Sequence, residues 1–177
     1  KLKDDTTCNQ VLHDVVYPET RSHKCCYMDI MPGGPKPGAK WVSHWWGMTL
    51  RDLALSLAQD ATDLPREDLD PGLFAEDMAG LGDRELDQTY WIAIFGVNHY
   101  APMNFLDSIG MIMQNTRGVV VAIDPDLKYL GRSWCLMEIE QAIITERGLS
   151  YHLAGAFDVK SRQGKIKVSS LSESETK

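Results

Sequence analysis

The chain has 177 residues, of which 44% are hydrophobic and 24% charged, and its net charge is −7. This length and composition are typical of one globular domain with a sizeable core. The acidic balance argues against a nucleic-acid-binding surface, and no apolar run approaches the ~20 residues that span a bilayer. The chain begins with lysine and carries no signal-peptide pattern, so we expect it to be part of a longer protein.

The four cysteines do not have the spacing of a secreted disulfide framework. Cys25 and Cys26 are adjacent, Cys8 lies near the N-terminus, and Cys135 falls within a predicted core-facing helix. We therefore predict free thiols and a cytoplasmic or another reducing intracellular location. His23 beside the adjacent pair leaves a metal site as an alternative, but no paired C-x-x-C spacing supports it, so no metal is expected.

Changes in composition divide the chain into three regions. Residues 1–39 form an N-terminal extension that ends in a proline- and glycine-rich linker, residues 40–158 form an α/β domain, and residues 159–177 form a polar, partly disordered tail. Within the extension, the pattern predicts a short helix over Cys8–Val16 and an edge strand over Cys25–Met31.

The domain is predicted to begin with a short strand over Lys40–Ser43. A helix over Leu50–Ala61 follows, because leucines and alanines recur there at helical spacing and Thr49 can cap its first turn. The next apolar run predicts a strand over Tyr90–Phe95. Residues 62–87 between them are acidic and contain proline and glycine, so we predict a surface insertion.

The second half of the domain continues the alternation of helices and strands. The predicted elements are a helix over Pro102–Gln114, a strand over Gly118–Ile123, a helix over Trp134–Arg147 and a strand over Ser150–Phe157. The strand over Gly118–Ile123 is almost wholly apolar and β-branched, as expected when both faces of a parallel strand are buried. Ser133 is predicted to cap the helix that follows, and Gly148 to end it.

This alternation predicts an α/β fold with a parallel sheet of four to five strands and helices on both faces. A fifth strand would come from Ile166–Val168. One apolar face of the helix over Trp134–Arg147 is predicted to pack on the sheet, and its members are Cys135, Ile139, Ala142 and Ile143. Glu138 lies in the early turns of that helix, where the helix dipole favours an ionised carboxylate.

Polar and aromatic residues follow three of the predicted strands. They are Ser43, His44, Trp45, Trp46 and Gly47 after the first strand, Asn98 and His99 after the second, and Asp124, Ser133, Trp134 and Glu138 after the third. Because parallel strands end at one edge of a sheet, and α/β sheets bind ligands there, we expect a site at this edge. Indole rings could stack on a base or on nicotinamide. Glu138 could bind ribose hydroxyls or stabilise positive charge at an anomeric carbon.

Several of these residues also have a structural interpretation, which the sequence leaves open. His44 could be a hydrogen-bonded core histidine, and Asp124 could serve to end a strand. Glu138 could simply complement the helix dipole. Strand alternation also predicts that Trp45 and Trp46 face opposite sides, so both cannot point into the same core.

Motifs of other functional classes are missing from the sequence. It contains no G-x-G-x-x-G fingerprint, no Walker loop and no G-x-S-x-G elbow, which disfavours a Rossmann dinucleotide site, an ATPase and an α/β-hydrolase. A phospho-receiver-like regulator is a further alternative, but it requires acidic residues after the first strand, where this chain has His44-Trp45-Trp46.

The segment Ser133–Ile139, S-W-C-L-M-E-I, resembles the S-x-W-C-x-x-E-[LI] motif of Toll/interleukin-receptor (TIR) domains, without the spacer residue. As in that family, it follows a V-V-V-A-I-D-P strand. The segment Trp41–Gly47, W-V-S-H-W-W-G, is similar to the F-[IV]-S-x-x-x-[GE] first strand. With Y-W-I-A-I-F-x-x-N at residues 90–98, these motifs resemble a TIR-like group of protist proteins, over about Trp41–Leu153.

The resemblance implies a flavodoxin-like, three-layer fold and a signalling role. It also implies NAD⁺ as substrate, with Glu138 as the catalytic residue for cleavage of the nicotinamide–ribosyl bond. The residues that would bind NAD⁺ are Ser43, His44, Trp45, Trp46, Gly47, Asn98, His99, Ser133 and Trp134. Domains of this family act when self-associated, so self-association or binding to other protein subunits is expected.

Two departures from the family pattern favour an alternative function. Ala93 stands where the second strand usually carries an acid, and Met48 stands where the loop after the first strand often carries one. The long N-terminal extension points the same way. In this alternative, the chain is a non-catalytic TIR-like interaction module, or a structural subunit of a larger assembly.

Overall fold

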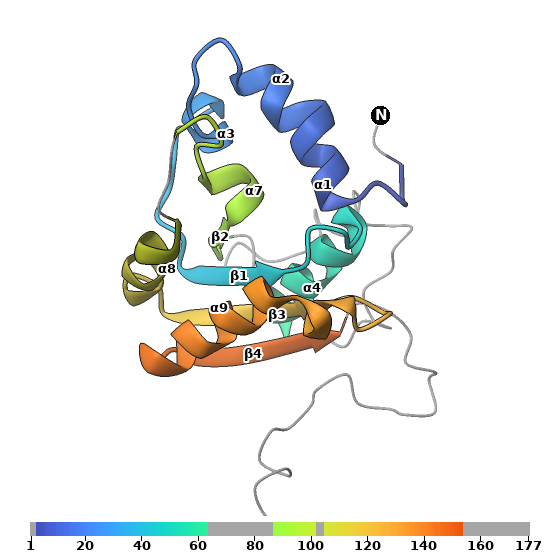
Figure 1. Ribbon diagram of the computed structural model, residues 1–177, viewed down its shortest axis with the longest axis vertical. Helices are drawn as coiled ribbons and strands as arrows, with labels where there is room; N and C mark the ends of the chain where they lie inside the picture. The colour runs from blue at the N-terminus through green and yellow to red at the C-terminus, as the bar shows by residue number, and fades with distance from the viewer. Residues whose placement is uncertain (1–2, 64–86, 102–104, 154–177) are drawn as a thin grey trace, which may run out of the picture.

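A four-stranded parallel sheet forms the centre of the part of the chain that the structure describes (Figure 1). That structure is a computed structural model covering residues 3–63, 87–101 and 105–153. The strands are β1 (Lys40–His44), β2 (Tyr90–Ile92), β3 (Gly118–Ile123) and β4 (Gly148–Leu153). Their order is β2-β1-β3-β4, and each neighbouring pair is parallel. This order is flavodoxin-like, so the predicted α/β fold class is confirmed.

Strand β3 is the most buried element, because all six of its residues are shielded from solvent. It pairs with β1 on one side and with β4 on the other. Its first residue, Gly118, lies against Gly148, and a Cβ there would stand 3.0 Å from the Gly148 carbonyl oxygen. The predicted bounds of this strand are confirmed at both ends.

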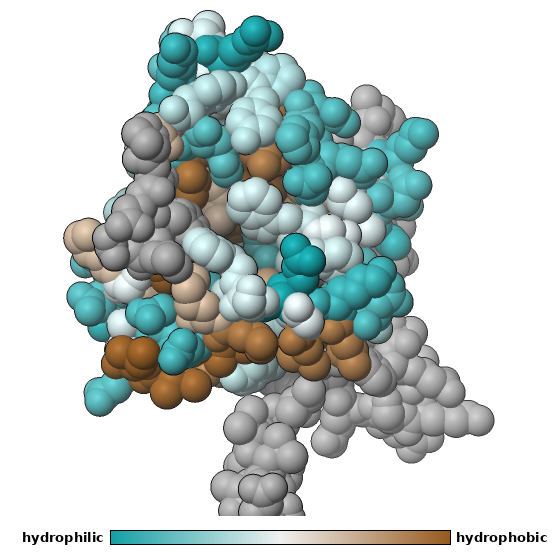
Figure 2. Space-filling view, in the orientation of Figure 1, coloured by the Kyte–Doolittle hydropathy of each residue, from teal (hydrophilic) through white to brown (hydrophobic). Residues whose placement is uncertain are grey.

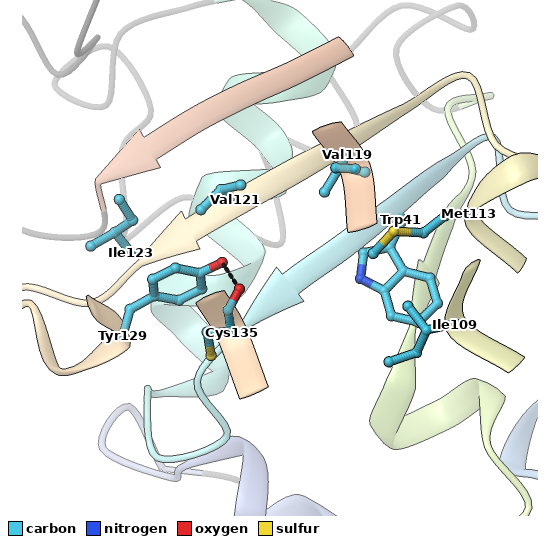
Figure 3. Packing of buried hydrophobic residues seen from close by; sticks show 9 residues of the cluster. Trp41, Ile109, Met113, Val119, Val121, Ile123, Tyr129 and Cys135 are labelled. Carbon is cyan, nitrogen blue, oxygen red and sulfur yellow. Dashed lines mark hydrogen bonds between the residues drawn. The ribbon is translucent and has the colours of Figure 1, made fainter. Parts of the chain in front are cut away.

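Two core clusters cover the two faces of the sheet. On one face, Trp41 and the odd-numbered residues of β3 pack against α8 (Phe105–Gln114) and α9 (Ser133–Ile144) (Figure 3). On the other face, Val42 and the even-numbered residues of β3 pack against α4 (Leu50–Thr62) and the N-terminal helices. Helices therefore lie on both faces, and the predicted three layers are present.

The cap predicted for α4 is confirmed. Thr49 has extended backbone angles, and its Oγ1 accepts a hydrogen bond from the backbone N–H of Asp52 at 3.0 Å. The helix ends one residue before Asp63, whose φ of 58° places it in the left-handed region. The side chain of Thr49 therefore satisfies a backbone donor that the first turn leaves without a helical partner.

The N-terminal extension is helical. Its first stretch runs through α1 (Cys8–Val11), the π-helical η1 (Leu12–Val16) and α2 (Tyr17–Thr20), so the predicted helix is present and is longer than expected. The predicted edge strand over Cys25–Met31 is wrong, because Tyr27–Ile30 forms the helical turn α3. The carboxylate of Asp29 accepts the Cys26 backbone N–H at 3.0 Å, and this local cap favours the turn.

The strand predicted over Tyr90–Phe95 is half right. Strand β2 ends at Ile92, and Ala93–Gly96 forms the short helix α7, in which the Val97 N–H donates to the Ala93 carbonyl oxygen at 3.1 Å. A short apolar run is compatible with a buried strand and with a buried helical turn, so periodicity could not separate the two.

The ends of α9 also differ from the prediction. Ser133 is the first helical residue and does not cap the helix; Arg132 holds the cap position without a side-chain hydrogen bond. The helix ends at Ile144, and the left-handed residue that follows is Glu146, with φ of 54°. Gly148 does not end the helix, because it already belongs to β4.

The buried face of α9 is rotated from the predicted one. Cys135 and Ala142 are buried, and Ile139 packs against the same cluster. Ile143, however, is 63% exposed, and Glu138 occupies a buried position. Figure 2 shows the resulting apolar band on the surface over α9, where the exposed apolar side chains are Leu136, Ile143 and Ile144.

Some predictions fall outside the described residues. They concern the surface insertion from residue 64 to 86, the fifth strand over Ile166–Val168 and the C-terminal tail. Among the described helices, none is long and apolar enough to cross a membrane.

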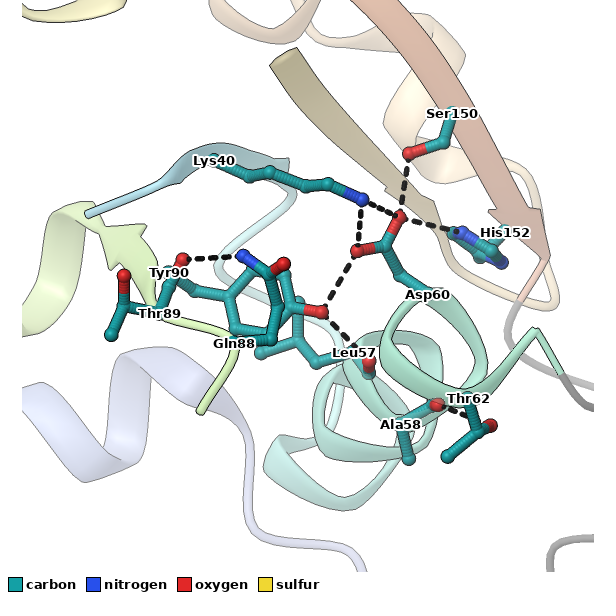
Figure 4. A network of polar contacts seen from close by, with 10 residues as sticks. All are labelled: Lys40, Leu57, Ala58, Asp60, Thr62, Gln88, Thr89, Tyr90, Ser150 and His152. Atoms are coloured by element: carbon teal, nitrogen blue, oxygen red, sulfur yellow. Dashed lines mark hydrogen bonds and ion pairs between the residues drawn. The ribbon is translucent and has the colours of Figure 1, made fainter. Parts of the chain in front are cut away.

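A buried carboxylate, Asp60, connects α4 to three strands (Figure 4). Its oxygens accept hydrogen bonds from Lys40 Nζ at 2.7 Å, Tyr90 Oη at 2.8 Å and Ser150 Oγ at 2.8 Å. His152 Nε2 lies 3.5 Å away. Burial opposes ionisation, but these donors outweigh it and hold the pKa of Asp60 well below its ordinary value.

We predict that Asp60→Asn lowers the free energy of unfolding at neutral pH by about 2 to 4 kcal/mol, because Lys40 loses the carboxylate that neutralises it. Urea denaturation measures this change. The matched control is Asp126→Asn, which breaks an exposed ion pair with Lys128 and should cost less than about 1 kcal/mol. Equal losses in the two variants would contradict the role given to the Asp60 network.

Candidate functional site

Glu138 lies inside the protein at the carboxyl end of the sheet. It stands in the second turn of α9, and its side chain is only 3% exposed. Its Oε2 lies 2.5 Å from the Oγ of Ser43, which is buried near the end of β1. Strands β1 and β3 are where the strand order of the sheet reverses, and this is the position at which α/β folds bind ligands. The structure therefore brings together two of the residues predicted from different strand ends.

Tyr129 extends this contact. Its hydroxyl lies 2.6 Å from Ser43 Oγ. It also lies 3.3 Å from the carbonyl oxygen of Cys135, a contact drawn in Figure 3. Tyr129 is fully buried and belongs to the 3₁₀-helix η3 (Lys128–Gly131), which connects β3 to α9. This tyrosine is not among the residues predicted for the site, although a large aromatic residue shortly after a buried strand was a usable signal.

Asp124 fixes the position of Tyr129. Its Oδ2 accepts the backbone N–H of Tyr129 at 2.7 Å, and its Oδ1 accepts the N–H groups of Asp126 and Lys128 at 3.2 and 3.1 Å. The buried carboxylate of Asp124 thus organises the turn after β3 through backbone donors. This matches the structural interpretation of Asp124 as a residue that ends the strand.

Burial changes the protonation of this cluster. It raises the pKa of Glu138 to about 8, although the side chains of Ser43, Trp41 and Trp134 favour the ionised form. It also raises the pKa of Cys135 to about 12 and moves the pKa of Tyr129 above its ordinary value. At neutral pH, Glu138 is therefore mostly a neutral carboxylic acid, and its neighbours keep their protons.

Trp45, Gly47 and Trp134 lie on the same side of the sheet edge as Glu138. Trp45 is half-buried against the core cluster that contains Tyr129 and Cys135, and Lys128 Nζ stands 5.3 Å from the centre of its ring. The indole crosses over Gly47, where a Cβ would lie only 2.2 Å from a ring carbon of Trp45. Trp134 is 40% exposed, and its side chain favours the ionised form of Glu138.

His44 and Trp46 lie on the opposite face of the sheet. His44 pairs with Ala122 in the register of β1 and β3, is 4% exposed, and has an Nε2 without a hydrogen-bond partner among the described residues. Burial lowers its pKa to about 4, so it is neutral. Trp46 packs against the cluster on the α4 face, so the prediction that Trp45 and Trp46 separate is confirmed. The structure does not bring His44 and Trp46 to Glu138.

Asn98 and His99 contact the N-terminal extension. Asn98 Nδ2 donates to the carbonyl oxygen of Lys24 at 2.7 Å. The His99 ring lies edge-on to Tyr17 and to Trp46, with centroid distances of 5.7 and 5.9 Å, and its Nε2 is 3.1 Å from the Ile94 carbonyl oxygen. Burial lowers the pKa of His99. In this structure both residues hold the extension and do not face Glu138.

The extension also binds the loop after β1. The N–H of Cys8 donates to the carbonyl oxygen of Met48 at 2.9 Å, and the N–H of Asn9 donates to that of Trp46 at 2.7 Å. Met48 is itself buried in the α4-side core. The N-terminal helix is therefore attached to the loops that follow both β1 and β2.

Ser133, the last of the predicted binding residues, is exposed at the first position of α9. All four cysteines are free thiols, with Cys8 and Cys135 buried. Among the described residues, no group of three or more histidine, cysteine or acidic side chains is arranged to hold a metal ion.

Comparisons of the chain with protein-family models, with curated proteins and with solved structures find no match. The resemblance to TIR domains therefore stays a prediction from the motifs.

We predict that Glu138→Gln stabilises the domain, and increasingly so as the pH rises. An unfolded glutamate loses its proton near the ordinary pKa of 4.5, whereas the native one keeps it to about 8. The unfolded state therefore binds fewer protons in this window, and native stability falls by at most about 1.4 kcal/mol per pH unit. Glutamine has the shape of the neutral acid but no proton to lose. The variant therefore does not lose stability in this way as the pH rises.

Chemical denaturation of the variant and the wild type at several pH values between these limits measures the effect. Glu140→Gln, two positions along the same helix and exposed, is the matched control. It should leave the pH dependence of stability unchanged. A Glu138→Gln difference that stays constant with pH would contradict the raised pKa.

Proposed function

We propose that this chain is a TIR-like domain that binds NAD⁺ and cleaves the bond between nicotinamide and ribose. The observation that carries the proposal is the buried Glu138 carboxyl, bonded to Ser43 at the switch point between β1 and β3. A carboxyl with a strongly raised pKa destabilises the native state at neutral pH, and such groups are concentrated in functional sites. The motif over Ser133–Ile139 supports the same assignment.

In this proposal, Glu138 contacts the ribose that carries nicotinamide. The ionised carboxylate would accept hydrogen bonds from ribose hydroxyls and stabilise the positive charge that forms at the anomeric carbon as the bond to nicotinamide breaks. Ser43 would orient the carboxylate through its 2.5 Å contact. The half-buried indole of Trp45, on the same side, offers a flat surface for stacking.

The buried state of Glu138 means that the proposed reaction requires the site to open. Trp134 stands one turn before Glu138 on α9 and is partly exposed, and its side chain favours the ionised form of Glu138. Among the side chains that favour the ionised form of Glu138, it is the most exposed. The residues on the α4 side, His44 and Trp46, are not required in this version of the site.

We predict that the whole chain, incubated at high concentration with NAD⁺, releases nicotinamide. Glu138→Gln should lower the rate by at least about 100-fold, because removing one group that stabilises developing charge has effects of that size. Chromatographic measurement of nicotinamide and of the ribosyl product would also separate hydrolysis from cyclisation. Glu140→Gln, on the exposed side of the same helix, should retain the wild-type rate.

A non-catalytic interaction module is the second candidate function. The shielding of Glu138 supports it, and so does the N-terminal extension, which is attached to the loops after β1 and β2. The apolar band on α9 is the kind of surface that protein partners cover. Absence of nicotinamide release, together with unchanged nuclear magnetic resonance signals of Trp45 and Trp134 on addition of NAD⁺, would favour this function over the first.

A further inference from the structure

Four oxygen atoms, joined by three contacts, form an unbroken chain from Glu138 into the core. Glu138 Oε2 lies 2.5 Å from Ser43 Oγ, and Ser43 Oγ lies 2.6 Å from Tyr129 Oη. Tyr129 Oη is in turn 3.3 Å from the carbonyl oxygen of Cys135. Both hydroxyl groups are buried, so neither can complete its hydrogen bonds with bulk water.

Each hydroxyl in this chain has one hydrogen to donate, and this limits the possible arrangements. When Glu138 is ionised, it can only accept, so Ser43 donates to Glu138 and Tyr129 donates to Ser43. When Glu138 is protonated, the carboxylic acid can donate to Ser43. Ser43 then donates to Tyr129, and Tyr129 donates to the carbonyl oxygen of Cys135. Every hydrogen has an acceptor in both arrangements.

We propose that this hydrogen-bond chain reverses direction with the protonation of Glu138, and that Tyr129 is the positioning residue that makes both directions possible. The inference rests on the proposed function, because it assigns Tyr129 a role in preparing the Glu138 carboxylate for the ribose. No covalent bond forms within the chain. The proton of Glu138 leaves to solvent or ligand, and the Ser43 and Tyr129 hydroxyl groups only rotate.

The other titratable groups around the chain do not compete with Glu138 for protons near neutral pH. Burial raises the pKa of Tyr129, of Tyr151 on β4 and of Cys135 on α9, so all three keep their protons while Glu138 titrates. Arg132 and Asp124 act on Cys135 with opposite signs. The reversal is therefore driven by Glu138 alone among these groups.

The reversal predicts opposite effects of two substitutions on the pKa of Glu138. Ser43→Ala removes the donor to the carboxylate in the ionised state and the acceptor of the acid hydrogen in the protonated state. The charge-assisted bond is the stronger of the two, so the pKa rises. Tyr129→Phe removes the acceptor for the Ser43 hydrogen in the protonated state. In the ionised state, the same substitution only removes the Tyr129 hydrogen bond that polarises the Ser43 hydroxyl. Leaving the buried Ser43 hydrogen without an acceptor costs more free energy, so the protonated state is destabilised more. The pKa of Glu138 therefore falls by about one pH unit.

Nuclear magnetic resonance of the whole chain, labelled with carbon-13 and without NAD⁺, tests this from about pH 5 to about pH 10. In the wild type, the Glu138 carboxyl, the Tyr129 ring carbon that bears the hydroxyl, and the Cys135 carbonyl should titrate with one midpoint. In Tyr129→Phe, the Cys135 carbonyl should lose most of its titration shift, while Glu138 still titrates. Tyr151→Phe, which removes a hydroxyl outside the chain of hydrogen bonds, is the matched control and should leave all three signals at the wild-type midpoint.

Two results would overturn the inference. One is a Cys135 carbonyl that does not respond to the wild-type titration, or that responds equally in Tyr129→Phe. The other is a Glu138 pKa that stays the same or rises in Tyr129→Phe, as expected if the tyrosine only fills space or only donates to Ser43. Because the measurement uses no NAD⁺, a reversing chain without nicotinamide release would disprove the proposed function alone.

Discussion

The contact between Ser43 and Glu138 joins the end of β1 to the second turn of α9, and the carboxyl edge of the sheet is organised around it. The contact places a carboxyl group beside a core cluster of hydrophobic side chains that includes Tyr129 and Cys135. Three further features accompany it: burial keeps Glu138 neutral although Ser43 favours its ionised form, Tyr129 is buried beside Ser43, and α9 is oriented so that Ile143 is exposed.

Two buried carboxyl groups of this chain show how environment decides charge. Asp60 receives hydrogen bonds from a lysine, a tyrosine and a serine, and its pKa lies below the ordinary value. Glu138 is supported by one hydroxyl and two indoles, all of them neutral, and its pKa lies above the ordinary value. The first arrangement stabilises the fold across the physiological pH range. The second does so only while the acid keeps its proton, which is why we connect Glu138 and not Asp60 with function.

Strand alternation divides the edge of the sheet into two sides with different tasks. Ser43 and Trp45 belong to the side of Glu138, whereas His44 and Trp46 belong to the side of α4. On that second side, His99 packs against Trp46 and the N-terminal helix, so these aromatic residues hold the extension in place. A site at this edge is therefore smaller than the row of residues after the strands suggests.

The sequence alone determined the fold class, the central strand and the capped helix α4, because each depends on local patterns of apolar spacing or capping, and its motifs predict a functional role for Glu138. The tertiary structure decided three features that apolar periodicity does not predict. It selected a helical turn after Ile92, rotated α9 so that Glu138 is buried and Ile143 is not, and placed Tyr129 against Ser43. These outcomes depend on which side chains meet across elements far apart in the chain, and the burial that results sets the protonation of Glu138.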